Sequence, residues 1–208
     1  MQFLKKLFGS SGPKNVTIEI DSVWQTDQAK RQGIGKEIQR ADQSDAVAIL
    51  VIAHFADSLR WVQEVTESIS CQTPVMAVLA DQLSASIASG LDVTHSDIIE
   101  LIIAERHPLP RVDGKVLNDF AAVLPCRCRV TYHHSLEEPL MRQFAGDNLS
   151  RMLEMLGMQP DEKIESSMVT RAIRNAQKRL ASALSSNSHS GLKADSMEEW
   201  FQKNVSKK

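Results

Sequence analysis

The apolar run AVAILVIA, residues Ala46–Ala53, decides the fold of this 208-residue chain. A short, nearly continuous stretch of valine, isoleucine, leucine and alanine suits a β-strand that is buried on both faces, as strands of a parallel sheet are. Two more runs have this character, PVMAVLA at Pro74–Ala80 and IIELIIA at Ile98–Ala104. The sequence therefore predicts a largely parallel sheet of buried strands.

Strand and helix patterns alternate around this run. The other expected strands are Val16–Ile20 and Arg127–His133, and the expected helices are Thr26–Arg40, Leu59–Ile69 and Gly114–Val123. Alternation of this kind is typical of an α/β fold with a mostly parallel sheet. The order predicts a RecA-like sandwich, of the P-loop NTPase type, followed by C-terminal helices.

Helical patterns follow the predicted sheet. Ser135 and Glu138 fit the S-x-x-E capping box, so we expect a helix to begin there, and Gly157 is well placed to end the next helix. Four apolar residues then recur at steps of three and four: Val169, Ile173, Ala176 and Leu180. This spacing predicts a helix that packs lengthwise on the body of the protein.

The segment Ser135–Leu180 resembles part of the SecA preprotein-translocase family, where the second ATPase-fold domain leads into the long scaffold helix. The matching residues are Ser135, Leu136, Leu140, Met141, Arg142, Phe144, Gly146, Asp147, Leu156, Gly157, Met158, Asp161, Glu162, Ile164, Glu165, Met168, Val169, Thr170, Arg171, Ile173, Ala176, Gln177 and Lys178. The resemblance implies a SecA-like protein that is reduced to this domain and the start of the scaffold, without the P-loop domain.

Four regions are expected on this basis. Residues 1–14 form an amphipathic N-terminal tip, and residues 15–134 form the RecA-like domain. Residues 135–184 form the SecA-like helical segment with the start of the scaffold helix. Residues 185–208 form a flexible linker and a short helix that Trp200 and Phe201 anchor.

The N-terminal tip separates apolar from basic residues on a helical pattern. The residues concerned are Phe3, Leu4, Lys5, Lys6, Leu7 and Phe8. The tip resembles the N-terminus of SecA proteins, which implies contact with anionic lipid and with the translocation channel. The alternative is a start segment that only packs on the body of the protein.

A second stretch, AERHPLPRVD at Ala104–Asp113, also resembles SecA. The matching residues are Glu105, Arg106, His107, Arg111 and Asp113. Because Glu105 follows a predicted strand, as His54 follows another, these side chains lie at the sheet edge where α/β proteins bind ligands. They are either a remnant ligand or partner surface, or ion pairs that tie the loops to the core.

Residues that hydrolyse ATP in the SecA family have no counterpart here. Helicase-type motif VI arginines follow the ERH stretch in the motors, but GKVLNDFAAVLPC at Gly114–Cys126 contains none. An arginine of this kind contributes roughly 10³–10⁵-fold to phosphoryl transfer. The only P-loop-like run, Gly33–Lys36, has the wrong spacing and a helical pattern. We therefore expect a non-enzyme with no catalytic residues and no nucleotide cofactor.

Composition and cysteine usage limit the other functions. A formal net charge of −2 gives no general attraction to nucleic acid. Cys126 and Cys128, with His133 and His134 nearby, admit a zinc site, but the C-x-C spacing and the adjacent histidines favour ordinary thiols, so no metal is expected. The three cysteines make no convincing disulfide framework, and the sequence has no apolar run that spans a bilayer.

The combined expectation is a non-catalytic accessory or regulatory protein in the cytoplasm, with possible peripheral contact to the inner membrane. Its partners by resemblance are a SecA motor or the translocation channel, and a homo-oligomer stays open. Two alternatives also stay open. One is a nucleotide-binding protein that completes its site with a partner's P-loop, and the other is a general interaction scaffold.

Overall fold

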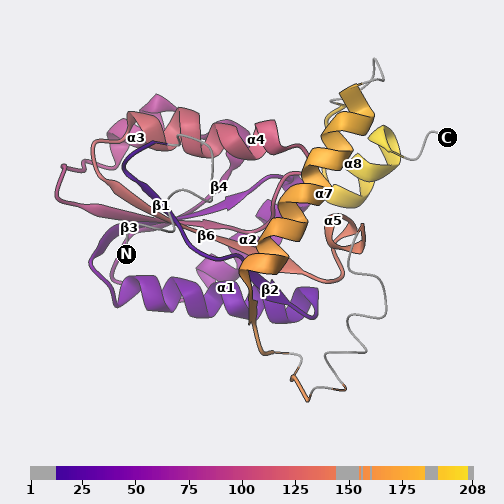
Figure 1. The fold of residues 1–208 in the computed structure, drawn as a ribbon. Helices are drawn as coiled ribbons and strands as arrows, with labels where there is room; N and C mark the ends of the chain where they lie inside the picture. The colour runs from indigo at the N-terminus through magenta and orange to yellow at the C-terminus, as the bar shows by residue number, and fades with distance from the viewer. Residues whose placement is uncertain (1–12, 144–154, 156, 160, 186–191, 206–208) are drawn as a thin grey trace.

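The computed structural model describes residues 13–143, 155, 157–159, 161–185 and 192–205. Within them lies a seven-stranded sheet in the order β4-β3-β5-β6-β2-β7, and β1 pairs with β6. The strands are β1 (Val16–Ile18), β2 (Ser22–Trp24), β3 (Ala46–Ala53), β4 (Val75–Leu79), β5 (Ile98–Ile103), β6 (Arg127–Ser135) and β7 (Ile164–Glu165). The described pairs are parallel except β2 with β7 (Figure 1).

Helices connect these strands. The α-helices are α1 (Asp27–Asp42), α2 (Ala56–Glu67), α3 (Ala85–Gly90), α4 (Pro110–Lys115), α5 (Pro139–Arg142), α7 (Ser167–Ser185) and α8 (Met197–Asn204). A π-helical segment, Val116–Phe120, and a 3₁₀ turn, Ala121–Val123, continue α4, and a second 3₁₀ turn, Ala80–Gln82, follows β4. No helix in the described ranges is both long and apolar enough to cross a bilayer.

Both faces of the sheet are covered, which is why β3 is apolar throughout. Ile49 and Val51 pack on one side against α1 and α2. Leu50 and Ile52 pack on the other side, against the helical segment that follows α4. Figure 1 shows α1 below the sheet and α3 and α4 above it. This arrangement confirms the predicted α/β class and is consistent with a RecA-like fold.

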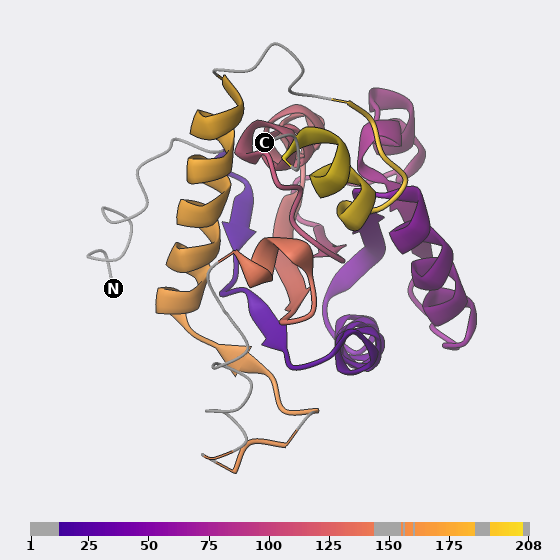
Figure 2. The same ribbon diagram turned by 90° about the vertical axis from the view of Figure 1, so that its right-hand side faces the viewer.

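A third apolar cluster covers the sheet at the carboxyl ends of its parallel strands. It joins α5, α7 and α8 to β2 and to the loops after β3 and β5, with Trp200 2% exposed and Phe201 8% exposed. Figure 2 shows these three helices nearest the viewer. The expected anchoring of the last helix by Trp200 and Phe201 is confirmed. The four predicted regions stay a prediction, although β7, α7 and α8 pack against the same body.

Two strands differ from the expectation. The run Val16–Ile20 ends as a strand at Ile18, and β2 follows from Ser22. Ile18 pairs with Val130 and Ser22 with His133, so one extra residue interrupts the pairing with β6, as in a β-bulge. The strand β4 lies at the edge of the sheet and is half-buried, with Met76 43% exposed, whereas the apolar run indicated a buried strand.

The expected capping box at Ser135 is wrong. Ser135 is the last residue of β6, and its hydroxyl donates to the Asp27 carboxylate. Helix α5 begins at Pro139, and the side chain of Glu138 makes no capping hydrogen bond. The physical reason is competition, because the Glu138 carboxylate accepts a hydrogen bond from the buried Lys30 ammonium.

Gly157 has a φ of +78°, the left-handed conformation expected of a residue that ends a helix. Of the helix predicted before it, Met155 is described, and it is helical. Ser185, where the linker was expected to begin, is the last residue of α7, and residues 186–191 and the tip residues 1–12 lie outside the described residues.

Candidate functional site

A chain of buried charges runs along the carboxyl edge of the sheet. Arg106, directly after β5, donates from Nε and Nη2 to the two carboxylate oxygens of Asp21 at 2.8 and 3.0 Å. Its Nη1 donates to Asp113 Oδ2 at 3.2 Å. The imidazole Nε2 of His54 lies 3.1 Å from Asp113 Oδ1. The guanidinium thus joins Asp21 to the segment 106–113, and His54 joins the same cluster through Asp113.

The chain of charges continues toward α1. Asp21 Oδ2 lies 3.1 Å from His134 Nε2, and His134 Nδ1 lies 3.3 Å from Glu138 Oε2. The Lys30 ammonium donates to Glu138 Oε1 at 2.6 Å. Seven residues thus form a carboxyl-edge network: Lys30, Glu138, His134, Asp21, Arg106, Asp113 and His54.

Neighbouring opposite charges favour the ionised forms of Asp21 and His134 although water is excluded. Burial raises the pKa of Asp21, but Arg106 and His134 outweigh it and hold that pKa well below its usual range. Burial lowers the pKa of His134, but hydrogen bonds to Asp21 and Glu138 raise it above its usual value. His134 is therefore favoured as an imidazolium between two carboxylates.

Neighbouring groups fix the network from its sides. The guanidinium of Arg106 lies 3.5 Å from the ring centroid of Tyr132. The amide of Gln177 on α7 donates to Asp113 Oδ2 and to the His107 carbonyl, both at 2.7 Å. The His107 ring stands 5.6 Å, centroid to centroid, from Trp200 of α8. Helices α7 and α8 are thus attached directly to the carboxyl edge.

The histidine His107 stays uncharged in this setting. The backbone N–H of His107 donates to Asp113 Oδ1 at 2.7 Å, and the ring Nδ1 accepts from the backbone N–H of Leu109 at 3.0 Å. Burial, with a smaller contribution from His54, lowers the pKa of His107 to about 4. A neutral ring at this place packs between apolar neighbours rather than titrating near neutral pH.

Backbone amides that would receive a phosphate at this edge already have partners. At the start of α1, the Asp27 N–H donates to Glu137 Oε2 at 2.7 Å and the Ala29 N–H donates to Thr26 Oγ1 at 3.1 Å. At the start of α2, the Asp57 N–H donates to the Asp195 carbonyl at 2.9 Å. Free amides at helix N-termini are what phosphates bind. These amides are capped by the chain itself.

Most of the predicted edge residues come together. Glu105, Arg106, His107, Asp113 and the His54 side chain are buried at the carboxyl edge. Arg111 is different, because it lies exposed on α4. The membrane-contact residues of the tip lie outside the described ranges. Whether the edge residues serve a ligand stays a prediction, and in the structure they form ion pairs and hydrogen bonds within the chain.

Sequence reasoning did not place Asp21, Lys30, His134 and Glu138 in this network. For Lys30 a signal exists: it lies four residues before Ile34 and eight before Ile38, on the buried stripe of α1. A lysine on such a stripe needs a buried counter-ion. For Asp21 no pattern in the sequence points to Arg106, because their pairing depends on the interruption of the strand between β1 and β2.

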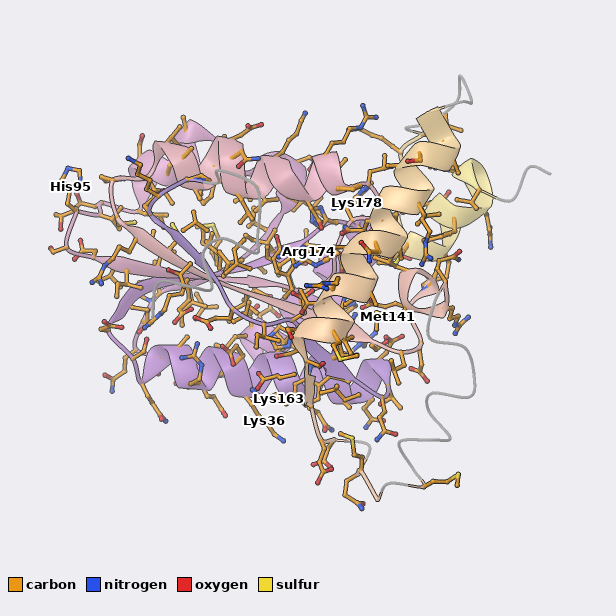
Figure 3. The ribbon with its side chains drawn as sticks, viewed as in Figure 1. Lys36, His95, Met141, Lys163, Arg174 and Lys178 are labelled. Carbon is orange, nitrogen blue, oxygen red and sulfur yellow. The ribbon has the colours of Figure 1, made fainter. Side chains whose placement is uncertain are left out.

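The other motifs have structural explanations. Gly33 lies against Trp24, and a Cβ at Gly33 would come within 2.0 Å of that indole, so the GIGK run is set by helix packing. The Lys36 side chain extends from α1 away from the sheet (Figure 3). Cys126 and Cys128 are both buried, and no His, Cys, Asp or Glu group in the described ranges is arranged to hold a metal.

The chain resembles parts of longer proteins. No family model matches it. Protein translocase subunit SecA of Legionella pneumophila (strain Corby) is 43% identical over 106 residues, which cover 49% of this chain and 12% of that protein. The SecA subunit of Clostridium acetobutylicum is 39% identical over 94 residues, covering 45% and 11%. That of Nitratidesulfovibrio vulgaris is 38% identical over 95 residues, with the same coverage. The chain thus spans about a tenth of these relatives, and the similarity supports a SecA-like family over about half of its length.

Proposed function

We propose that this protein is a non-catalytic, SecA-like accessory or regulatory module of preprotein translocation. The similarity to translocase subunits over about half the chain supports the association with export. The stretch Gly114–Cys126 contains no arginine where SecA-like motors carry their motif VI arginines, which supports a non-catalytic role. The protein then acts by binding another protein rather than by hydrolysing ATP.

The observation that carries the proposal is the state of the carboxyl edge. This edge is where an α/β sheet of this kind binds its ligand. Here the amides of Asp27, Ala29 and Asp57 are capped by the chain, and the side chains form an internally neutralised network. Helix α8 packs its Trp200 against His107 at the same edge. An edge used in this way supports a structural role in place of nucleotide binding.

The partners follow from the same similarity. We infer a protein partner that belongs to the export apparatus, either a SecA motor or the translocation channel, at the cytoplasmic side of the inner membrane. An anionic membrane surface is a second contact, through the tip residues Phe3–Phe8. Nucleic acid is not a partner, since the net charge is −2.

The proposal is tested by turnover and by co-purification. We expect no steady-state ATP hydrolysis by the purified chain above buffer background, and we expect a SecA motor or the channel to co-purify with it from its own cells. A tagged chain in which Arg106 is replaced by methionine serves as the folding-sensitive control for capture. Turnover near the ~1 per second of slow kinases, lost on substitution within this chain, would contradict the non-catalytic role.

Binding of a fluorescent ATP analogue tests the alternative function, in which this chain binds nucleotide together with a partner that supplies the P-loop. We expect no saturable binding to the chain alone, and no binding in the mixture beyond what the co-purified partner shows by itself. An additional saturable site in the mixture, absent from the chain alone and from the partner alone, would replace the proposal by a site shared between two chains. Capture without any export component would favour a general scaffold.

The N-terminal tip is expected to give weak, salt-sensitive binding to anionic vesicles. Burial of its four apolar side chains contributes ~25 cal/mol per Å², and Lys5 and Lys6 contribute about 1 kcal/mol each near an anionic surface. Vesicle flotation of the full chain and of a variant without residues 1–9 measures this. Equal flotation of the two proteins would show that the tip is not the membrane contact.

A further inference from the structure

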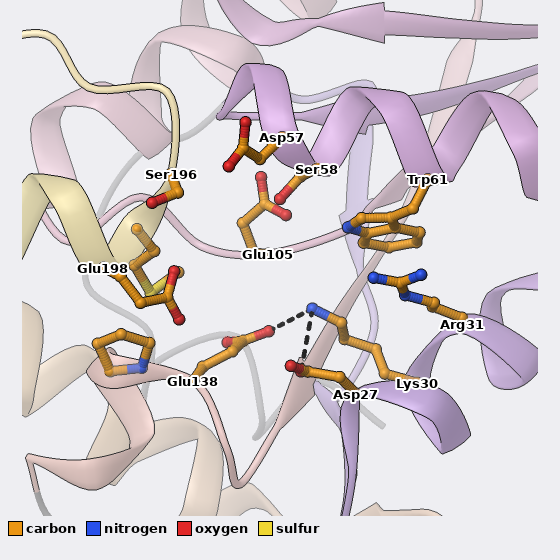
Figure 4. A pocket seen from close by; sticks show the side chains of 12 residues that line it. Asp27, Lys30, Arg31, Asp57, Ser58, Trp61, Glu105, Glu138, Ser196 and Glu198 are labelled. Carbon is orange, nitrogen blue, oxygen red and sulfur yellow. Dashed lines mark hydrogen bonds and ion pairs between the residues drawn. The ribbon is translucent and has the colours of Figure 1, made fainter.

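A cavity of about 200 Å³ opens at the carboxyl edge, between the first turns of α1 and α2 and the start of α8 (Figure 4). Carboxylates dominate its wall. Five acidic residues line it, against two basic ones: Asp27, Asp57, Glu105, Glu138 and Glu198, with Lys30 and Arg31. A concave site with one sign of charge in excess concentrates ligands of the opposite sign. The charge of the wall therefore favours a cation.

The deepest carboxylate of this cavity has unused hydrogen-bonding capacity. Glu105 is 1% exposed, and its Oε1 accepts from the His54 N–H at 2.6 Å. The Ser58 side chain lies next to this carboxylate (Figure 4), but no donor among the described residues makes a hydrogen bond of normal geometry to Oε2. Buried polar atoms are nearly always paired. A ligand donor that enters the cavity supplies the missing partner.

The two basic residues of the wall are already engaged. The Lys30 ammonium donates to Glu138 and lies 5.1 Å from the Trp61 ring centroid. The Arg31 guanidinium lies at the same distance from that ring. The amides of Asp27 and Asp57 also have partners within the chain, so neither is free to bind an anion.

We propose that this cavity binds a primary ammonium group on an alkyl chain, as carried by a lysine side chain or a small aliphatic amine. The volume is below the roughly 300–1,000 Å³ of drug-sized sites, and it suits one unbranched chain. An ammonium brings three donors, enough for Glu105 Oε2 and for the rim carboxylates of Asp57 and Glu198. This site is separate from any association with export.

Electrostatics around Glu105 add to the attraction. Burial raises the pKa of Glu105, while Lys30 and His54 act to lower it. A second cation beside Oε2 stabilises the ionised carboxylate further. Asp57 also pairs with Arg60, but exposed ion pairs are weak, so the rim keeps its attraction for the ligand.

Isothermal titration calorimetry of the full chain with three probes tests the site. We expect saturable binding of cadaverine and of N-acetyl-lysine methylamide, and none of 1-pentanol, which has the alkyl chain without the charge. Tighter binding of the lysine derivative identifies a peptide lysine as the natural ligand, and tighter binding of cadaverine identifies a free amine. Failure of both amines to saturate at millimolar concentration overturns the proposal.

Substitutions locate the binding within the cavity. Glu105→Gln removes one charge-assisted hydrogen bond, for which a loss of about tenfold or more in affinity is expected. Glu67→Gln, at the far and exposed end of α2, is the matched control and leaves affinity unchanged.

A second variant tests the site without a buried substitution, so that a loss of binding does not come from misfolding. Asp57→Asn combined with Glu198→Gln changes only exposed rim residues, and it is expected to weaken amine binding severalfold. Unchanged affinity in both cavity variants overturns the proposal. Displacement of the amine by inorganic phosphate, rather than by a second amine, would overturn it as well.

Discussion

Replacing Arg106 with methionine is expected to lower the free energy of unfolding by about 3–5 kcal/mol. The guanidinium is 5% exposed and provides three hydrogen bonds to Asp21 and Asp113. Methionine can cover the Tyr132 ring but leaves both buried carboxylates without the guanidinium that they share. Urea denaturation followed by circular dichroism measures the loss.

Arg111→Met is the matched control for this experiment, since Arg111 lies exposed on α4, and a change within about 0.5 kcal/mol is expected. A variant that also carries Asp21→Asn should recover part of the loss, because the two residues share one network. A loss below about 1 kcal/mol for Arg106→Met would mean that solvent or other side chains neutralise Asp21 and Asp113.

Acid sensitivity gives the same substitution a second readout. Arg106 and His134 hold the folded-state pKa of Asp21 below its unfolded value, against the effect of burial. A depressed carboxylate pKa stabilises the fold above the unfolded pKa, and this contribution is lost as the pH falls through the folded pKa. In the Arg106→Met variant the pKa of Asp21 in the folded state rises. The stability that ionised Asp21 still contributes should therefore be lost at a higher pH than in the unaltered protein.

The sheet was predictable from sequence because its strands are buried on both faces. In β3, every residue except Val47 is buried, so apolarity alone marks the strand. The break between β1 and β2 was not predictable, because it depends on one extra residue relative to β6. The edge position of β4 was hidden for a related reason, since an edge strand covered on one face can be as apolar as a central strand.

The candidate site was predictable only in part. The ERH stretch follows an apolar strand, so its place at the carboxyl edge could be inferred from the order of elements. Its partners could not, because Asp21, His134 and Glu138 come from segments 85, 28 and 32 residues away from Arg106 that meet only through the sheet order. The capping-box pattern at Ser135 failed because the carboxylate of Glu138 forms a buried ion pair that a local motif does not register.

Replacing Ile173 with aspartate is expected to destabilise the protein by at least about 4 kcal/mol. Ile173 is fully buried on α7 in the apolar cluster that also holds Leu140, Trp200 and Phe201. The substitution removes apolar contacts and places a carboxylate within an apolar cluster. Because most of the stability of a helix within a protein comes from the packing of its apolar face, α7 depends on these contacts.

Met168→Asp, one turn earlier on the same helix, is the matched control. Met168 is 80% exposed, so the same carboxylate there stays in water and the unfolding free energy should change by less than about 1 kcal/mol. Met168 lies in the first turn of α7, where an acidic side chain is favourable by about 0.3–1 kcal/mol, so the much larger loss expected at Ile173 reports mainly on burial. If the two variants melt alike, the face formed by Val169, Ile173, Ala176 and Leu180 is not packed on the body in solution. The attachment of α7 to the carboxyl edge through Gln177 would then be in doubt as well, since that hydrogen bond requires the same docking.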